Sequence, residues 1–324
     1  MLNYLLPFLL SLGIMLVVTP KLTKLAHRIN YTEKPNKDSQ RKIHTESKAY
    51  LAAVGIFFAF WCCYFLVTRD FSTKALAVLG SSFLIWVIGM ADDWFKINGR
   101  DLKALPKFVF QLMACIMAVY FANIKFIGIT NPFNDAYIMF PLWVQYVLSV
   151  LWLFGVTTVI NFSDGLDGLA GGITCISAGT LFIVSIVKGN YLLGSMSIIL
   201  VGVCLGYLRY NRYPAKILMG DAGATFLGFM LAVISLDGAF KQATAVSIFV
   251  PILALGLPIF DNIFVVFKRL REGKKVYEGD ASQIHYRLLA KGLTQKQAVY
   301  FLYLVCICLN LSAIILLLLG TGRY

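Results

Sequence analysis

Carboxylates and glycines interrupt an otherwise apolar sequence at four places. The motifs are GMADDW with Asp92 and Asp93, NFSDGLDG with Asp164 and Asp167, LMGDAGA with Asp221, and PIFDN with Asp261. Ionisable residues at a membrane boundary are costly unless they are paired, solvated or bound to a cation, so each motif is a functional hypothesis. Oxygen ligands without cysteine suit Mg²⁺ or Mn²⁺. We therefore expect these carboxylates to form a metal site.

The same motifs carry features that suit phosphate. Glycines flank Asp164, Asp167 and Asp221, and without a Cβ the backbone N–H groups can approach a phosphate at a helix start. The polar segment 267–297 adds basic residues and one His, which can bind an anion or move a proton. Carboxylates for a metal, exposed amides and nearby lysines together indicate phosphoryl transfer.

Two other interpretations fit parts of this pattern. Any single Asp followed by Gly and small residues can be a helix N-cap. Capping does not require the adjacent carboxylates of Asp92 and Asp93, which repel each other unless a cation or a shared proton offsets them. A cation-coupled transporter also uses Asp clusters, but its site usually lies near the bilayer midplane in broken helices.

The composition predicts an integral membrane protein. Hydrophobic residues make up 59% of the 324 residues, charged residues 14%, and the mean hydropathy is +0.76. A spanning helix needs roughly 20 apolar residues. About ten such runs lie at 2–19, 51–67, 74–90, 107–122, 142–160, 170–187, 190–207, 222–236, 243–266 and 298–319. We expect an all-α, polytopic protein with about ten transmembrane helices, eleven at most, forming a single domain over residues 1–324.

The charge distribution predicts the orientation. If the N-terminus is outside, the cytoplasmic loops and helix ends hold 23 of the 29 Lys and Arg residues, which agrees with the positive-inside rule. The four acidic motifs and all three His residues then face the cytoplasm. The net charge of +13 follows from this bias, so no nucleic-acid partner is expected. The seven cysteines lie in apolar runs without metal-ligand spacing.

The ordered motifs resemble the polyprenyl-phosphate N-acetylhexosamine-1-phosphate transferases, glycosyltransferase family 4. Among them the chain is most similar to the bacterial branch that uses undecaprenyl phosphate and N-acetylglucosamine 1-phosphate. The matching segments are EKPN, RKIH, ADDW with Lys107 and Gln111 after it, NFSDGLDGLAGG, NRYPAKILMGDAG, LGLPIFD and DASQIHYRLLAKG. The resemblance covers nearly the whole chain.

The resemblance implies a fold, a reaction and a location. The fold is a helical bundle with a cytoplasmic groove and a broken ninth helix that reaches toward lipid. The reaction is an Mg²⁺-dependent transfer, with Mn²⁺ able to substitute, of N-acetylglucosamine 1-phosphate from a UDP-sugar to undecaprenyl phosphate, which releases UMP and starts a lipid-linked cell-surface glycan. The location is the bacterial cytoplasmic membrane with the site facing the cytoplasm, and a homodimer is compatible with the sequence.

The resemblance also assigns roles to individual residues. The implied metal ligands are Asp221 and Asn161. The implied catalytic residues are Asp92, Asp93 and His285. The implied substrate-binding residues are Lys42, His44, Lys107, Asp164, Asp167 and Arg287.

The sequence departs from the family pattern at positions that bear on the donor. Thr158, Leu218, Gln283 and Tyr286 stand where the family usually has Asn, Phe, His and His. The donor sugar therefore stays open. The alternative within the enzyme class is a phospho-N-acetylmuramoyl-pentapeptide translocase, which normally carries a run of adjacent histidines where this chain reads QIHY. The alternative from another class is the cation-coupled transporter.

Overall fold

The computed structural model describes residues 2–33, 47–100, 102–131, 136–239, 243–273 and 282–321. Twelve helices account for most of these described residues. In chain order they are α1 Leu2–Arg28, α2 Ala52–Thr68, α3 Thr73–Ile97, α4 Ala104–Phe121, α5 Leu142–Phe162, α6 Leu169–Val187, α7 Tyr191–Asn211, α8 Gly220–Ala239, α9 Ala245–Ala254, α10 Gly256–Arg271, α11 Ile284–Ala290 and α12 Gln295–Thr321. Short strands lie between them: β1 Thr32–Glu33, β2 Lys48–Ala49, β3 Gly128–Thr130, β4 Tyr137–Met139 and β5 Ala243–Thr244.

The long helices match the predicted apolar runs. Within the described ranges, eight helices are long and apolar enough to cross a membrane, and the bent pair α9 and α10 supplies a ninth span. Helix α2, with 17 apolar residues, fills the second predicted run. Such sequences form helices in a bilayer because a helix satisfies its backbone polar groups internally. The predicted all-α, polytopic membrane fold is confirmed.

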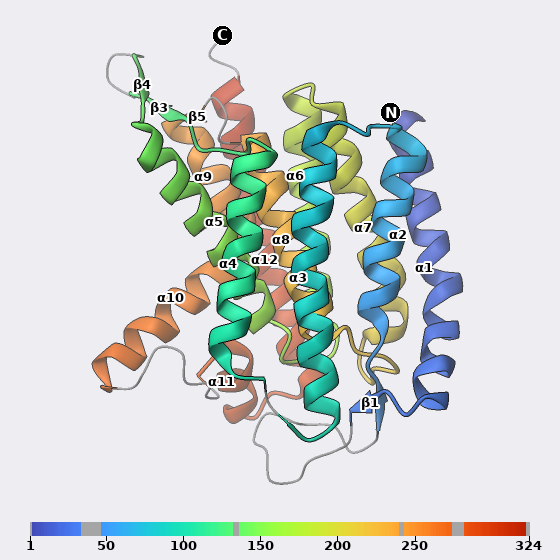
Figure 1. The fold of residues 1–324 in the computed structure, drawn as a ribbon. Helices are drawn as coiled ribbons and strands as arrows, with labels where there is room; N and C mark the ends of the chain where they lie inside the picture. The colour runs from blue at the N-terminus through green and yellow to red at the C-terminus, as the bar shows by residue number, and fades with distance from the viewer. Residues whose placement is uncertain are drawn as a thin grey trace.

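Helix α8 lies in the middle of the bundle (Figure 1). It packs against α2, α3, α5 and α6. In the apolar stretch of α8, 94% of the residues are buried, compared with 22% in α4. Helix α8 is therefore surrounded by protein, whereas α4 turns most of its apolar side chains outward. The acidic residue in the first turn of α8, Asp221, is thus held at the centre of one end of the bundle.

The ninth span is broken. Helices α9 and α10 meet with a bend of 81°, and Figure 1 shows α10 slanting away from the bundle. Helix α10 exposes the rings of Phe264 and Phe267 and ends with Lys268, Arg269 and Arg271 in its last turn. An exposed apolar face followed by basic residues is typical of a helix at the membrane interface. The broken helix and its amphipathic continuation, both predicted from the sequence, are confirmed.

The two ends of the bundle carry different small elements (Figure 1). Strands β3, β4 and β5 form a sheet near the end where α1 begins, whereas α11 and β1 lie at the opposite end. Strand β2 pairs with β1. We call this second end the α11 end. The last turns of α3 and the first turn of α8 meet there, because a backbone hydrogen bond links Asp221 to the side chain of Asp93.

Helices α3 and α8 approach each other closely at Gly89, one turn before Asp93. A Cβ at Gly89 would lie 2.4 Å from the Cα of Ala222. We expect Gly89→Ala to push α3 away from α8 and to cost about 1–3 kcal/mol, because the neighbour is backbone and cannot rotate aside. The thermal unfolding midpoint of the detergent-solubilised protein measures this loss.

Gly80 on the same helix is the matched control, because a Cβ there meets nothing within 4 Å. Gly80→Ala should leave the midpoint unchanged or raise it slightly, since Ala favours the helix by roughly 0.5–1 kcal/mol. Equal midpoints for the two variants would show that the close approach at Gly89 does not matter.

Candidate active site

Three carboxylates from two helices meet at the α11 end. Asp92 and Asp93 come from the last turns of α3, and Asp221 comes from the first turn of α8. One ligand atom from each lies within 4.8 Å of the others. The side chains of Asp92 and Asp93 are almost fully buried. The structure thus brings together three of the predicted site residues, although Asp221 follows the pair by more than a hundred residues.

Asp93 holds the start of α8. Its two carboxylate oxygens accept hydrogen bonds from the backbone N–H groups of Asp221, at 2.9 Å, and of Ala222, at 3.1 Å. These N–H groups have no partner within their own helix, and the positive end of the helix dipole favours the negative charge. Asp93 is therefore an N-cap supplied from another helix. Asp93 thus caps a helix, but the helix that it caps is α8 and not a helix that follows it in the sequence.

Asp92 is bound by lysines instead. The Lys96 Nζ lies 3.0 Å from Asp92 Oδ2 and 2.8 Å from Asp221 Oδ2. The Lys107 Nζ lies 2.5 Å from Asp92 Oδ2 and 3.9 Å from Asp221 Oδ2. Two ammonium groups therefore offset three carboxylates. Lys107 was predicted, but Lys96 was not, although its position four residues after Asp92 on one helix is the signal that would have identified it.

The donor set fits a hard divalent cation. Three carboxylates supply oxygen ligands, and Asp92 Oδ1 is buried and accepts no hydrogen bond from the described residues. Mg²⁺ and Mn²⁺ prefer such oxygen ligands. Asp221 is the predicted ligand that belongs to this group. For Asn161, the other predicted ligand, no hydrogen bond links its side chain to the cluster within the described part of the chain, so its role stays a prediction.

Asp167 ties three distant segments together. Its carboxylate accepts hydrogen bonds from Lys48 Nζ, at 2.8 and 3.1 Å, and from the backbone N–H of Ala215, at 2.9 Å. Lys48 is in β2, and its neighbour Ala49 bridges to Ile217. The contacts of Asp167 position the loop between α5 and α6, and its predicted contact with a nucleotide stays a prediction. Nothing local in the sequence marked Lys48 as its partner.

Asn211, at the end of α7, fixes the same loop. Its Oδ1 accepts a hydrogen bond from the backbone N–H of Gly168 at 2.9 Å, and its Nδ2 donates to the carbonyl of Ile217 at 2.8 Å. The side chain is buried. Sequence reasoning missed Asn211, because an Asn at a helix end has many ordinary explanations.

Asp164 lies in this loop without a comparable ion pair among the described contacts. Burial raises the pKa of its carboxyl to about 7, and the negative charge of Asp221 adds to the increase. The group is therefore balanced between its two protonation states near neutral pH. A cation or a donor group on a substrate would favour the charged form.

The two predicted residues of α11 point to different neighbours. His285 is buried against the loop that carries Asp164, where a Cβ on Gly165 would lie 2.1 Å from its Nε2. Burial lowers the pKa of His285 to about 4, and its Nε2 has no hydrogen-bond partner among the described residues. The imidazole is thus neutral near pH 7. Arg287 instead donates to Asp261 of α10 at 2.9 Å.

The Arg287 contact anchors α11 to the broken span. Asp261 also accepts the backbone N–H of Ile284, at 2.9 and 3.0 Å. The guanidinium of Arg287 lies 4.1 Å from the ring centroid of Phe264. Asp261 and Arg287 therefore fix α11 beneath α10. The predicted substrate contact of Arg287 stays a prediction.

The remaining predicted positions divide into two groups. Lys42 and His44 lie outside the described residues. Thr158, which departs from the family pattern, accepts a hydrogen bond from Gln111 Nε2 at 2.9 Å. Gln111 follows Lys107 by one turn of α4, so this bond connects α5 to the helix that carries a site lysine.

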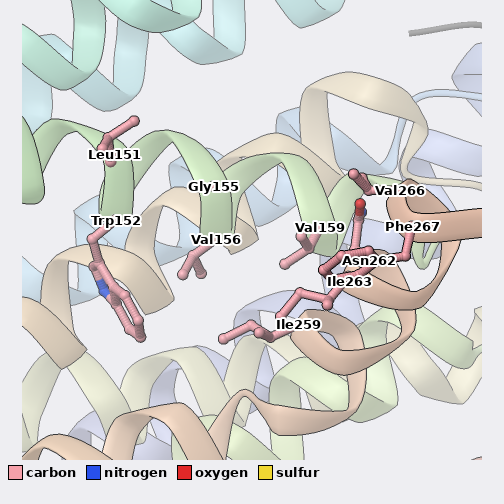
Figure 2. Close-up of a pocket in the computed structure, with 10 residues that line it drawn as sticks. All are labelled: Leu151, Trp152, Gly155, Val156, Val159, Ile259, Asn262, Ile263, Val266 and Phe267. Atoms are coloured by element: carbon pink, nitrogen blue, oxygen red, sulfur yellow. The ribbon is translucent and has the colours of Figure 1, made fainter. Parts of the chain in front are cut away.

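An apolar pocket of about 330 Å³ lies between α5 and α10. Figure 2 shows Val156 and Val159 of α5 and Ile259 and Ile263 of α10 lining it. Asn262 is the one polar side chain among the ten residues that line this pocket. The pocket-lining Val159 follows Thr158 in the sequence, so the pocket and the α4–α5 contact use the same stretch of α5.

The cap made by Asp93 predicts different effects for two substitutions. Asp93→Ala removes both acceptors, so we expect a loss of about 1 kcal/mol from the cap and weaker Mn²⁺ binding as the first turn of α8 loosens. Asp93→Asn keeps one acceptor oxygen and should retain more of the stability and more of the Mn²⁺ affinity. The unfolding midpoint and Mn²⁺ titration followed by electron paramagnetic resonance measure the two effects. If Asp93→Asn lost as much as Asp93→Ala in both measurements, the carboxylate charge rather than the cap would be essential.

The buried ion pair of Lys48 and Asp167 predicts a loss of stability. Lys48→Met takes the ammonium partner away from a buried carboxylate, so we expect a cost of about 3 kcal/mol. Adding Asp167→Asn should restore part of the unfolding midpoint, because the uncompensated charge is then removed. Lys24→Met, at an exposed site on α1, is the control. A midpoint of Lys48→Met equal to that of the control would contradict the prediction.

Comparison with known proteins identifies the family. The family model described as glycosyl transferase family 4 matches residues 75–239. A probable undecaprenyl-phosphate N-acetylglucosaminyl 1-phosphate transferase of Bacillus subtilis (strain 168) is 35% identical over 98% of this chain and 86% of its own length. The undecaprenyl-phosphate alpha-N-acetylglucosaminyl 1-phosphate transferase of Yersinia pestis is 25% identical over 95% of this chain and 82% of its own length. A phospho-N-acetylmuramoyl-pentapeptide-transferase of Prochlorococcus marinus is 29% identical over 95% of this chain and 89% of its own length. With a family match that includes the Asp92, Asp93 and Asp221 cluster, this chain belongs to glycosyl transferase family 4.

Proposed function

We propose that this membrane enzyme transfers N-acetylglucosamine 1-phosphate from a UDP-sugar to undecaprenyl phosphate and releases UMP. The observation that carries the proposal is the cluster of three carboxylates and two lysines at the α11 end. An apolar pocket between α5 and α10 adds a surface that suits a lipid. Relatives named as undecaprenyl-phosphate N-acetylglucosaminyl 1-phosphate transferases support the choice of donor and acceptor. The product would begin a lipid-linked cell-surface glycan.

The reaction is a phosphoryl transfer in which positioning and electrostatics do most of the work. An oxygen of the acceptor phosphate attacks the β-phosphorus of the UDP-sugar, and the bond from that phosphorus to the bridging oxygen of the diphosphate breaks. UMP leaves with the bridging oxygen. If the acceptor phosphate carries a proton, Asp92 is the carboxylate placed to accept it, since Asp93 is held by backbone N–H groups.

Asp221 and Asp92 would hold a divalent cation, Mg²⁺ or Mn²⁺. When bound, such an ion supplies charge neutralisation on the diphosphate. Lys107 and Lys96 lie within reach of the same carboxylates and are the cations that can turn to phosphate oxygens. The imidazole of His285, in α11 beside the Asp164 loop, is neutral near pH 7, so it can offer a hydrogen-bond donor or acceptor to a substrate rather than a positive charge.

The apolar pocket suits the lipid acceptor. Its walls from α5 and α10 are almost wholly apolar, and α10 slants out of the bundle (Figures 1 and 2). In this proposal the polyprenyl chain enters there from the bilayer, while its phosphate reaches the lysines of the cluster. The proposed orientation places the α11 end in the cytoplasm, because most Lys and Arg residues lie in the loops and helix ends on that side.

The donor is tested by a panel of UDP-sugars that includes UDP-N-acetylglucosamine and UDP-N-acetylmuramoyl-pentapeptide. Purified protein with undecaprenyl phosphate and Mg²⁺ should release UMP with UDP-N-acetylglucosamine. Asp221→Ala should reduce the rate by at least about 100-fold, as expected for the loss of transition-state charge stabilisation. UMP release is measured by chromatography.

Asp70→Asn is the matched control, because it removes a carboxylate at the opposite end and Asn can still accept the hydrogen bond from Tyr64. It should keep most of the activity. Turnover of the pentapeptide donor alone would favour the translocase alternative, and no turnover with any UDP-sugar would reject the proposal.

A further inference from the structure

The Lys96 ammonium lies between the carboxylates of two helices, in the place where a bridging cation would lie. Its distances to Asp92 Oδ2 and Asp221 Oδ2 are 3.0 and 2.8 Å. We propose that Lys96 is an exchangeable internal cation: it holds the carboxylate cluster together in the metal-free protein and gives up its place when a divalent cation binds. This inference rests on the metal site of the proposed function and adds a residue that competes for it.

The negative charges of the three carboxylates must be offset. Asp92, Asp93 and Asp221 lie close together and are mostly buried, so they repel one another strongly unless cations or hydrogen-bond donors offset them. The N–H groups of α8 satisfy Asp93. Asp92 and Asp221 depend on lysines, and Lys96 is the lysine within 3.0 Å of both. In the metal-free protein its ammonium therefore holds α3 and α8 in register.

A divalent cation and the Lys96 ammonium would compete for the same two carboxylates. Mg²⁺ binds carboxylate oxygens at roughly 2.0–2.1 Å, so an ion held by Asp92 and Asp221 would compete with the Lys96 ammonium for the negative charge of both carboxylates. Lys107 differs, because its Nζ is 2.5 Å from Asp92 Oδ2 but 3.9 Å from Asp221 Oδ2. Lys107 therefore lies to one side of the position between Asp92 and Asp221. It can keep its contact with Asp92 when a divalent cation binds.

The Lys96 side chain has room to move away from the carboxylates. Lys96 is the second-last residue of α3, and its side chain is 32% exposed. A lysine has a flexible stem of four carbons and a compact charge, which suits movement between partners. After leaving the carboxylates, the ammonium needs an anion, and the diphosphate of the donor would supply one. Metal binding and donor binding should therefore favour each other.

Titration of the metal-free protein with Mn²⁺ alone, without nucleotide, tests the exchange. Free Mn²⁺ is followed by electron paramagnetic resonance in detergent solution. Lys96→Met removes the competing cation, so we expect it to bind Mn²⁺ roughly tenfold more tightly than wild type. Lys107→Met is the matched variant, because it removes a charge that is as close to Asp92 as Lys96 or closer, at 2.5 Å, but lies 3.9 Å from Asp221. We expect it to tighten binding by no more than about threefold, and the exposed Lys103→Met by less.

Three results of the titration would overturn the proposal. Unchanged or weaker Mn²⁺ binding by Lys96→Met would show that Lys96 does not compete. Equal effects of Lys96→Met and Lys107→Met would mean that only the general loss of positive charge matters. Failure of Mn²⁺ to bind both wild type and Lys96→Met would mean that no cation exchanges there.

A second measurement needs no variant. Amine-directed labelling of the wild-type protein, read by mass spectrometry, should modify Lys96 several-fold faster with saturating Mg²⁺ than without it, because the ammonium is released from the carboxylates. Lys24 and Lys103, both exposed, should label equally in the two conditions. Unchanged or slower labelling of Lys96 with Mg²⁺ would overturn the proposal. Neither the Mn²⁺ titration nor the labelling requires turnover. Cation exchange without UMP release would therefore reject only the proposed function. UMP release without cation exchange would reject only the role of Lys96.

Discussion

Repulsion among three clustered carboxylates is the constraint on which the rest of the structure depends. Asp92, Asp93 and Asp221 can lie together only because cations and backbone amides offset their charges. Lysines bind Asp92 and Asp221, whereas the first turn of α8 donates two hydrogen bonds to Asp93. These contacts require α3 and α8 to pack closely and in one register. Helix α8 lies at the centre of the bundle, where 94% of its apolar stretch is buried, so its first turn can be reached from several neighbouring helices.

The segments around the cluster are held by contacts of the same kind. The ion pair of Lys48 with Asp167 joins β2 to the loop before α6, and the ion pair of Arg287 with Asp261 joins α11 to α10. Each contact is made by a charged residue that a motif alone would assign to a substrate. In this fold, charges therefore do two kinds of work at one end of the bundle: some hold the loops in place, and others are left to meet a ligand.

The break between α9 and α10 shapes the side of the bundle beside α5. The 81° bend lets α10 slant outward, and an apolar pocket lies between α5 and α10. A membrane-bound acceptor needs such an apolar surface, whereas a water-soluble donor needs the polar cluster at the α11 end. The fixed contact of α11 with α10 keeps His285 beside the Asp164 loop despite the break.

The sequence by itself determined the membrane fold, because each spanning helix is encoded locally by an apolar run that satisfies its own backbone in a bilayer. It also identified the carboxylates, since charged residues are rare enough in such a chain to be informative, and the resemblance to the family added Lys107. Only the tertiary structure decided how the charges are shared. Asp93 became a cap of another helix, Asp167 and Arg287 entered ion pairs, and Lys96 came to lie between Asp92 and Asp221. These partners are far apart in the chain, apart from Lys96 and Asp92, and a charge's partner is set by distance in space, which no local pattern encodes.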